Sequence, residues 1–490
     1  MHTNMKLAAA VAGVLSSTAA FAIGTTNTPI TTGTANIILN MAGSSAARDA
    51  LILDMDKLLC DRNFGGTGGQ AGTDGIDTLN FYKVSGNGDL RVFSCTLLPN
   101  GGGAGQLPAN FTTGLGGKNV IVYYRSDGGS VWGAIGAGRN TSIIRANLDT
   151  TAGAVPAGSP GVTNDAAAYN YGTLTGTYSI QLAATTDGQT TATGSVALDT
   201  PLIGVLDVGL ENFTLAANWP TAILVAGPVL TGAEVTTYGA NDKTTYGQIF
   251  GIIVNKATAG GNWASTTFPI ADLSLSSADI AGIFTHKYTD WSAVPSIKAA
   301  GSPLSGAIGI CRRDIGSGSH VVITTTFLNT GCGRGSTAFS TIVNAASGTT
   351  PLFRSSTGQE LSCVNGLTGG IGYSSYDDTA SFQTATSSNN LLFLKVDGVA
   401  PGKLNAANGS YPLWEELHFL QNPTAYAAAA QLTKDFADSI TGFFQLQPAP
   451  AAANGISLNA VNATVDPPVS PNWVALGGRA NACSKLINAH

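Results

Sequence analysis

Short apolar segments alternate along this chain with turns of small polar residues and with amphipathic helices. Residues 37–39 predict a buried strand, which a Gly-Ser-Ser turn follows, and apolar positions such as Leu51 and Leu58 then predict a helix. Residues 120–124 predict a second strand before a Gly-Gly-Ser turn, and residues 249–254 predict a third. This alternation favours an α/β fold with largely parallel sheets.

The first two turns have the arrangement that directs backbone N–H groups at an anion. Ser44 or Ser45 is placed to cap the helix that follows residues 37–39, and Ser130 ends the second turn. A helix that starts at such a turn presents unsatisfied amide N–H groups. The alternative is a plain strand-to-helix connection without a ligand, because such turns are common.

Residues 137–201 differ from the rest of the chain. They are rich in Thr, Gly, Ala and Asn and hold few large apolar side chains. This composition predicts a surface insertion with a β-hairpin within residues 176–198.

The first residues have the pattern of an export signal. A short positive segment, an apolar run and Ala20-Phe21-Ala22 predict a signal peptide over residues 1–22. The apolar run is too short to span a bilayer, and no later segment predicts a membrane helix. The mature protein is therefore expected in a periplasm or outside the cell.

The low and slightly negative charge of the chain bears on its possible partners. Charged residues make up 11% of the chain, against about 25% in a typical soluble domain, and the formal net charge is −6. This balance disfavours binding to nucleic acid or to acidic lipid.

The cysteines of an exported chain favour disulfides. There are six: Cys60, Cys95, Cys311, Cys332, Cys363 and Cys483. A structural zinc site is the weaker alternative, because no C-x-x-C spacing occurs and histidines are few. The preferred bridges join sequence neighbours, Cys60 with Cys95 and Cys311 with Cys332.

Residues 311–320, CRRDIGSGSH, predict a cradle for an oxyanion. Arg312 or Arg313 provides a charge-assisted contact. Further candidates are the acid Asp314, the hydroxyls of Ser317 and Ser319, and the backbone of Gly318. Asp314 either orients an arginine or accepts a proton from phosphate, which sulfate lacks near neutral pH. The alternative is a surface turn that caps a helix and leaves the arginines solvated.

The order of these segments resembles the periplasmic phosphate-binding proteins of high-affinity phosphate ABC transporters. Their landmarks are a helix ending IF-x-G-x-I-x-x-W, a loop R-x-D-G-S-G-T, a strand G-x-IGY and a returning YPI. The counterparts here are residues 283–291, 312–319, 370–373 and 411–413. The likeness covers most of the mature chain apart from the insertion.

The resemblance implies a two-lobed α/β fold of class II periplasmic-binding-protein type, with mixed, mostly parallel sheets and a β-rich insertion. The expected lobes are residues 23–245 with 411–490, and residues 246–410. It also implies phosphate or a related tetrahedral oxyanion in the cleft between them, an ABC permease as partner, and no cofactor.

This chain departs from the family's loops at three places. Ile315 interrupts the R-x-D-G-S-G-T pattern and Ser319 replaces its threonine, which leaves open whether Arg312 or Arg313 takes the arginine role. The Thr-Phe pair of the family's first loop aligns with Ser45 and Ala46. Where the third loop carries a G-x-S-D acid, the alignment places Glu211 and Asn212.

Two functions follow from these expectations. The first is an exported binding protein that captures an oxyanion without catalysis. The alternative is an extracellular surface or adhesion protein that reuses the scaffold without tight phosphate binding. An enzyme is disfavoured, because the five histidines are scattered and His320 fits the first turn of a helix better than the role of a base.

Overall fold

The computed structural model describes most of the predicted strands and helices. The described residues are 30, 32–61, 80–84, 87–103, 105–146, 148, 172–174, 176–177, 193–194, 196–220, 227–255, 257–258, 261–262, 274–300, 304–328, 353–354, 356–376, 391–446 and 455–456. The predicted signal peptide, Cys332 and Cys483 lie outside them.

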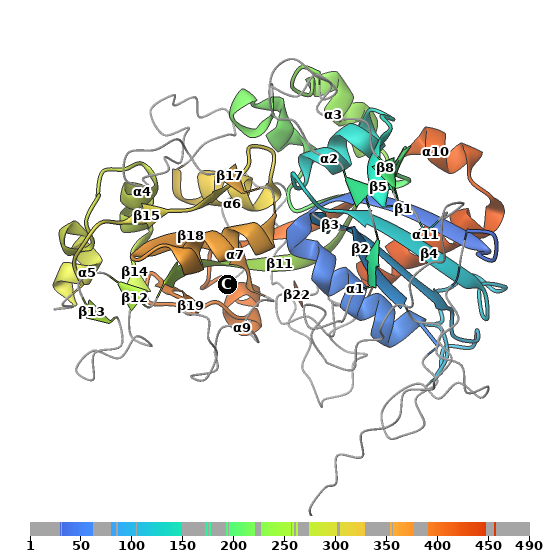
Figure 1. Ribbon diagram of the computed structural model, residues 1–490, viewed down its shortest axis with the longest axis horizontal. Coiled ribbons are helices and arrows are strands. Elements are labelled where there is room, and N and C mark those ends of the chain that lie inside the picture. The colour runs from blue at the N-terminus through green and yellow to red at the C-terminus, as the bar shows by residue number, and fades with distance from the viewer. Residues whose placement is uncertain are drawn as a thin grey trace, which may run out of the picture.

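Twelve of the described strands form one mixed sheet that runs through both halves of the molecule (Figure 1). Ten of them follow the order β15-β18-β11-β21-β10-β1-β4-β3-β2-β6, and β19 and β22 pair with β11. The bounds are β1 Ile37–Gly43, β2 Asn80–Val84, β3 Asn87–Thr96, β4 Asn119–Arg125, β6 Gly172–Leu174, β10 Ile203–Leu206, β11 Asp242–Asn255, β15 Gly309–Ile310, β18 Gly370–Ser375, β19 Leu391–Phe393, β21 Trp414–Gln421 and β22 Gly455–Ile456.

Helices of varied length surround this sheet. The α-helices are α1 Ser45–Leu59, α2 Val131–Gly133, α3 Gly232–Gly239, α4 Ser277–Phe284, α5 Pro295–Ala299, α6 Gly318–Leu328, α7 Thr357–Gly366, α9 Lys403–Ala407, α10 Pro423–Ala428 and α11 Gln431–Leu446. Shorter turns of helix are η1 Ala134–Gly138, η3 Leu210–Thr214, η4 Ala216–Asn218 and η7 Trp291–Ala293. No helix among the described residues is both long and apolar enough for a membrane span.

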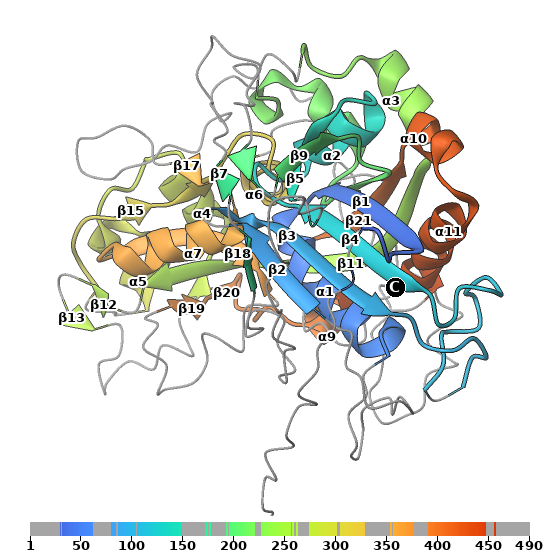
Figure 2. The ribbon, with the colours of Figure 1, turned by 45° about the vertical axis from the view of Figure 1, so that its right-hand side comes forward.

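We call the part of the molecule that contains β1, β4, β10, β21 and α11 the first half, and the part that contains β15, β18, β19 and α7 the second half. The first half is built on a parallel core of three strands. β1 pairs in parallel with β4 on one side and with β10 on the other. β3 continues the sheet beyond β4 (Figure 2). Helix α11 places Phe436, Ile440 and Phe444 at helical spacing on one face. These side chains are buried in one cluster with Phe419 of β21, so the helix is held to the sheet by apolar contact.

Strand β11 joins the two halves. Its first part, residues 242–249, pairs with β21 of the first half. Its last part, residues 250–255, pairs with β18 and β19 of the second half. A continuous strand therefore passes from one half to the other (Figure 1).

The second half contains β16, which begins at Arg312, and α7, which begins at Thr357. β15 pairs in parallel with β18, which places the start of the CRRDIGSGSH segment beside the strand that contains Tyr373. Helix α7 lies next to β18, and Asn255 of β11 donates its side-chain N–H groups to three carbonyls at the end of α7, those of Val364, Asn365 and Leu367. These contacts fix the end of α7 to the sheet.

The expected α/β fold with a mixed sheet is confirmed, but the share of parallel pairing is smaller than predicted. Strands β3, β11, β18 and β21 all form antiparallel pairs. The prediction was based on apolar runs. Such a run indicates that a strand is buried on both faces, but it does not indicate whether the strand is parallel or antiparallel to its neighbours.

The smaller ladders are two-stranded. They are β5 Ile143–Ala146 with β9 Val196–Asp199, β7 Gly176–Thr177 with β8 Thr193–Gly194, β12 Ala257–Thr258 with β13 Gly261–Asn262, β14 Ser274–Leu275 with β20 Lys395–Val396, and β16 Arg312–Arg313 with β17 Phe353–Arg354. The antiparallel pair of β7 and β8 agrees with the hairpin predicted within residues 176–198, whose middle lies outside the described residues.

Of the two preferred disulfides, one is confirmed and one is wrong. Cys60 bonds to Cys95, as expected. Cys311 bonds to Cys363 rather than to Cys332. Cys311 follows β15, which pairs with β18. Helix α7 brings Cys363 beside β18, and the Cα atoms of Cys311 and Cys363 lie 6.0 Å apart. Sheet pairing therefore overrides proximity in sequence.

Candidate functional site

Three parallel strands of the first half end at one edge of the sheet, and each is followed by a polar residue. Ser44 follows β1, Ser130 lies in the turn after β4, and Asp207 follows β10. All three side chains are buried. Polar side chains at the carboxyl ends of neighbouring parallel strands are the usual components of a ligand site in an α/β fold.

Asp207 is the centre of this group. Its carboxylate accepts hydrogen bonds from the hydroxyl of Ser44 and, at 3.1 Å, from the hydroxyl of Ser130. The Ser130 hydroxyl also accepts the backbone N–H of Asp207 at 3.0 Å. Burial raises the pKa of Asp207 to about 6, against the opposing effect of these hydroxyls and of the Arg313 charge. The carboxyl therefore changes its charge close to neutral pH.

Arg313 belongs to the second half. Its guanidinium nitrogen Nη1 donates to the Thr357 hydroxyl at 3.2 Å and to the Ser319 hydroxyl at 3.4 Å. Ser319 is also within 2.9 Å of the Ser317 hydroxyl. Arg313, Ser317 and Ser319 of the CRRDIGSGSH loop are thus in one cluster with Thr357. The Arg313 charge also acts on Asp207.

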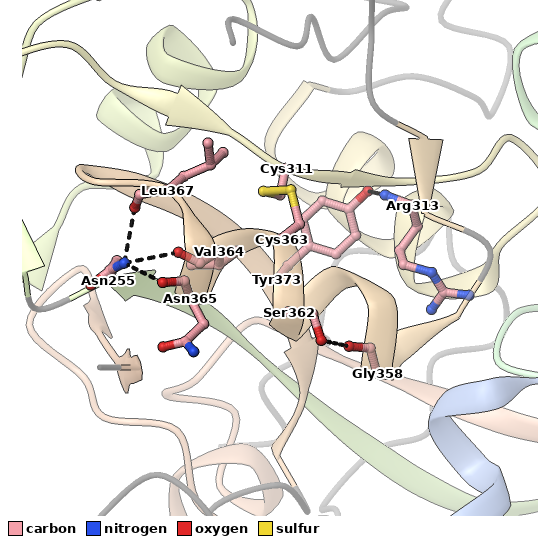
Figure 3. The surroundings of a disulfide bond; sticks show 10 residues. All are labelled: Asn255, Cys311, Arg313, Gly358, Ser362, Cys363, Val364, Asn365, Leu367 and Tyr373. Atoms are coloured by element: carbon pink, nitrogen blue, oxygen red, sulfur yellow. Dashed lines mark hydrogen bonds between the residues drawn. A yellow bond between two sulfur atoms is a disulfide. The ribbon is translucent and has the colours of Figure 1, made fainter. Parts of the chain in front are cut away.

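The backbone of Arg313 is held by a buried tyrosine. The Tyr373 hydroxyl accepts the Arg313 backbone N–H at 2.9 Å, and the guanidinium extends away from Tyr373 (Figure 3). The same hydroxyl lies 3.0 Å from Nδ1 of His320. Burial lowers the pKa of His320 to about 3 and raises that of Tyr373, so both side chains are neutral at physiological pH.

Glycine lets the two halves approach at the site. A Cβ on Gly318 would lie 2.5 Å from Ser130 Oγ and 2.5 Å from the Asp207 Cβ. A Cβ on Gly129 would lie 2.7 Å from the Cα of Ser317, and the backbone N–H of Val131 donates to the Gly316 carbonyl at 2.9 Å. The loop of residues 316–318 therefore lies directly on the strand ends of the first half, and only glycine fits at position 318.

The structure separates the two neighbouring arginines. Both are buried in β16, where successive side chains point to opposite faces. Burial lowers the pKa of Arg312, and the charges of Asp314 and Glu360 act against that effect. Both arginines act on the buried His320 and Tyr373, but Arg313 is the one whose charge is a cause of the Asp207 pKa shift. Counted from Arg313, the glycines and serines of residues 316–319 keep the family spacing without an insertion, and Ile315 stands at the acid position.

Asn212 and Asp207 show where sequence reasoning missed the site. The Asn212 side-chain amide donates to the Gly209 carbonyl, and the backbone carbonyl of Asn212 accepts from the Asn218 side chain, so these contacts lie within residues 209–218. Asp207 ends a G-x-x-D run that starts at Gly204, which has the spacing of the family's G-x-S-D acid. That signal was in the sequence, five residues ahead of the Gly209-Leu210-Glu211-Asn212 turn. Thr357, also missed, has no comparable signal.

The raised pKa of Asp207 predicts a pH-dependent stability. The folded protein holds this proton more tightly than an unfolded chain with a pKa near 3.8, so its free energy of unfolding falls as pH rises from about 4 to about 6. The ionised carboxylate then costs about 3 kcal/mol. We expect the unfolding free energy of Asp207→Asn, relative to the unsubstituted protein, to rise by about 3 kcal/mol between pH 3 and pH 8. Urea unfolding in anion-free buffer measures this difference, and parallel pH profiles would contradict it.

Comparison with known proteins identifies one domain. Residues 229–442 match the model of the PBP superfamily domain. No curated protein sequence gives a significant match.

Several solved structures are similar to parts of the chain. One is a putative phosphate ABC transporter substrate-binding protein with bound phosphate from Clostridium perfringens, with 19% identity over 52% of this chain and 80% of that one, and a TM-score of 0.33. Another is an ABC-type phosphate transport receptor from Vibrio cholerae, with 20% identity over 43% and 70%, and a TM-score of 0.28. A phosphate binding protein from Stenotrophomonas maltophilia has 16% identity over 54% and 82%, and a TM-score of 0.31.

Proposed function

We propose, for a chain that carries a PBP superfamily domain over residues 229–442, that this protein binds phosphate or a related tetrahedral oxyanion between its two halves without catalysing a reaction. The observation that carries the proposal is the buried arrangement of Asp207, Ser44 and Ser130 from the first half against Arg313 and Ser319 from the second. A site with several hydroxyls and one guanidinium can supply the hydrogen-bond donors and the positive charge that bind a small oxyanion.

The site combines donors with one acceptor. Taking an anion out of water is costly unless its oxygens are hydrogen-bonded. Arg313 supplies charge-assisted donors, and the serine hydroxyls and the first amides of α1 and α6 supply neutral ones. Asp207 supplies the acceptor that a protonated phosphate oxygen needs. Sulfate carries no such proton near neutral pH, so the acid favours phosphate.

The neutral state of His320 supports a binding role over a catalytic one. Its Nδ1 is engaged with Tyr373, and its pKa of about 3 makes it a poor general base near neutral pH. We assign the pair to the support of the Arg313 loop.

We extend the proposal to the organisation of the chain. Residues 23–245 and 411–490 form one lobe, residues 246–410 form the other, and β11 is the connection about which they move. Residues 1–22 direct export to the periplasm or the exterior, where a permease of the ABC type receives the ligand.

A phosphate-dependent rise in thermal stability tests the function. A ligand that binds only the folded state, at about a hundred times its Kd, adds about 2.7 kcal/mol to the free energy of unfolding. We expect that gain with phosphate in calorimetry or dye-based melting, and a smaller one with sulfate at equal ionic strength. An unchanged melting curve with both anions would contradict the proposal and favour the surface or adhesion role.

A further inference from the structure

The first residues of two helices from opposite halves contact each other at the proposed site. Ser45 begins α1 in the first half, and Thr357 begins α7 in the second. Their hydroxyl oxygens are 3.1 Å apart, and the backbone N–H of Thr357 donates to the Ser45 hydroxyl at 3.3 Å. Both residues are buried, with exposed fractions of 4% and 6%. The two halves are thus joined by a side-chain contact of the protein itself.

Thr357 also contacts the guanidinium. Its hydroxyl oxygen accepts an N–H of Arg313 at 3.2 Å. A hydroxyl has one hydrogen to donate and two lone pairs that accept. Thr357 can therefore accept from Arg313 and donate to Ser45 at the same time, which links the direction of the guanidinium to the contact between the halves.

We infer that Thr357 is a positioning residue of this site, which orients Arg313 and holds the two halves together before an anion arrives. The first part deepens the proposed function and rests on it, whereas the second does not depend on which anion binds. Because contacts within the protein stabilise the closed arrangement, part of the free protein is compact, and the apparent affinity for the anion is higher than it would be for an open protein.

Removal of one hydroxyl tests this inference. Thr357→Val keeps the shape of the side chain and loses its hydrogen bonds, whereas Thr357→Ser keeps the hydroxyl. Ser362→Ala is the matched control, because Ser362 is exposed on the same helix and donates to the Gly358 carbonyl at 2.9 Å (Figure 3). The readouts are the Kd for inorganic phosphate by calorimetry and the radius of gyration in phosphate-free buffer by small-angle X-ray scattering.

We expect Thr357→Val to raise the Kd for phosphate about tenfold, the equivalent of one lost hydrogen bond to a charged group. It should also enlarge the radius of gyration of the free protein. Thr357→Ser and Ser362→Ala should keep both values. Because the backbone N–H of Thr357 still donates to the Ser45 hydroxyl in Thr357→Val, Ser45→Ala should enlarge the radius of gyration further in that background.

Two outcomes would overturn the inference. One is a Thr357→Val variant with unchanged Kd and unchanged radius of gyration. The other is a Thr357→Ser variant as impaired as Thr357→Val, since the loss would then not come from the hydroxyl. If the protein binds no phosphate at all, the proposed function fails, and the radius of gyration alone decides on the contact between the halves. In that case an enlargement in Thr357→Val but not in Thr357→Ser supports the contact, and equal values refute it.

Discussion

Arg313→Ala is expected to raise the Kd for phosphate about 1,000-fold, which corresponds to about 4 kcal/mol. The guanidinium is the one cation whose charge acts on Asp207 among the causes of that residue's pKa shift, and it donates to Ser319 and Thr357. Its removal leaves a buried anion without a charge-assisted donor. Arg313→Lys should give an intermediate loss, because an ammonium keeps the charge but lacks the planar fork of donors.

A matched arginine serves as the control for this experiment. Arg145 forms an ion pair with Asp199 at 2.9 Å at the base of the insertion, and it takes no part in the proposed site. Arg145→Lys should keep the phosphate affinity measured by titration calorimetry. If Arg313→Ala binds phosphate as tightly as the unsubstituted protein does, the assignment of the anion to this cluster is refuted.

Asp207→Asn is expected to reduce the preference for phosphate over sulfate by about 100-fold, or about 3 kcal/mol. Two effects add. The amide cannot match the carboxylate as acceptor of a phosphate proton, and the repulsion between a buried carboxylate and sulfate disappears. Above pH 6 the carboxyl is ionised in the free protein, so the contrast is largest at about pH 8.

The measurement is the ratio of the two dissociation constants in the same buffer. Asp290→Asn is the control, since Asp290 caps the short turn η7 on the exposed surface and asparagine caps equally well. A ratio that stays the same in Asp207→Asn would refute the role of this carboxyl in selectivity, even if phosphate binding itself is retained.

The local elements of this protein could be predicted, and the contacts between them only in part. Apolar runs and the Ser44 cap predicted β1 and α1, because hydrogen bonds and burial of these segments are set within a few residues. Strand direction and the Cys311–Cys363 bridge could not be predicted, since both depend on which distant strands pair.

The candidate site, too, consists of local segments that the sequence could predict and of distant contacts that it could not. The serines of the turns and the CRRDIGSGSH loop could be proposed from the sequence because their chemistry is concentrated in a short stretch. The choice between Arg312 and Arg313 needed the structure, since only there does the charge of Arg313 act on Asp207 and its guanidinium contact Ser319 and Thr357. Thr357 was missed because its role comes from contact with Ser45, 312 residues earlier.

The disulfide between Cys311 and Cys363 has a consequence for biogenesis. The covalent ring that it closes contains Arg313, Ser317, Ser319 and Thr357, which are the contributions of the second half to the proposed site. In a compartment that keeps thiols reduced, no covalent bond would close this ring, and only sheet pairing and hydrogen bonds would hold the four residues together. We therefore expect the proposed site to reach its full stability only after oxidation, which for an exported chain follows its departure from the cytosol.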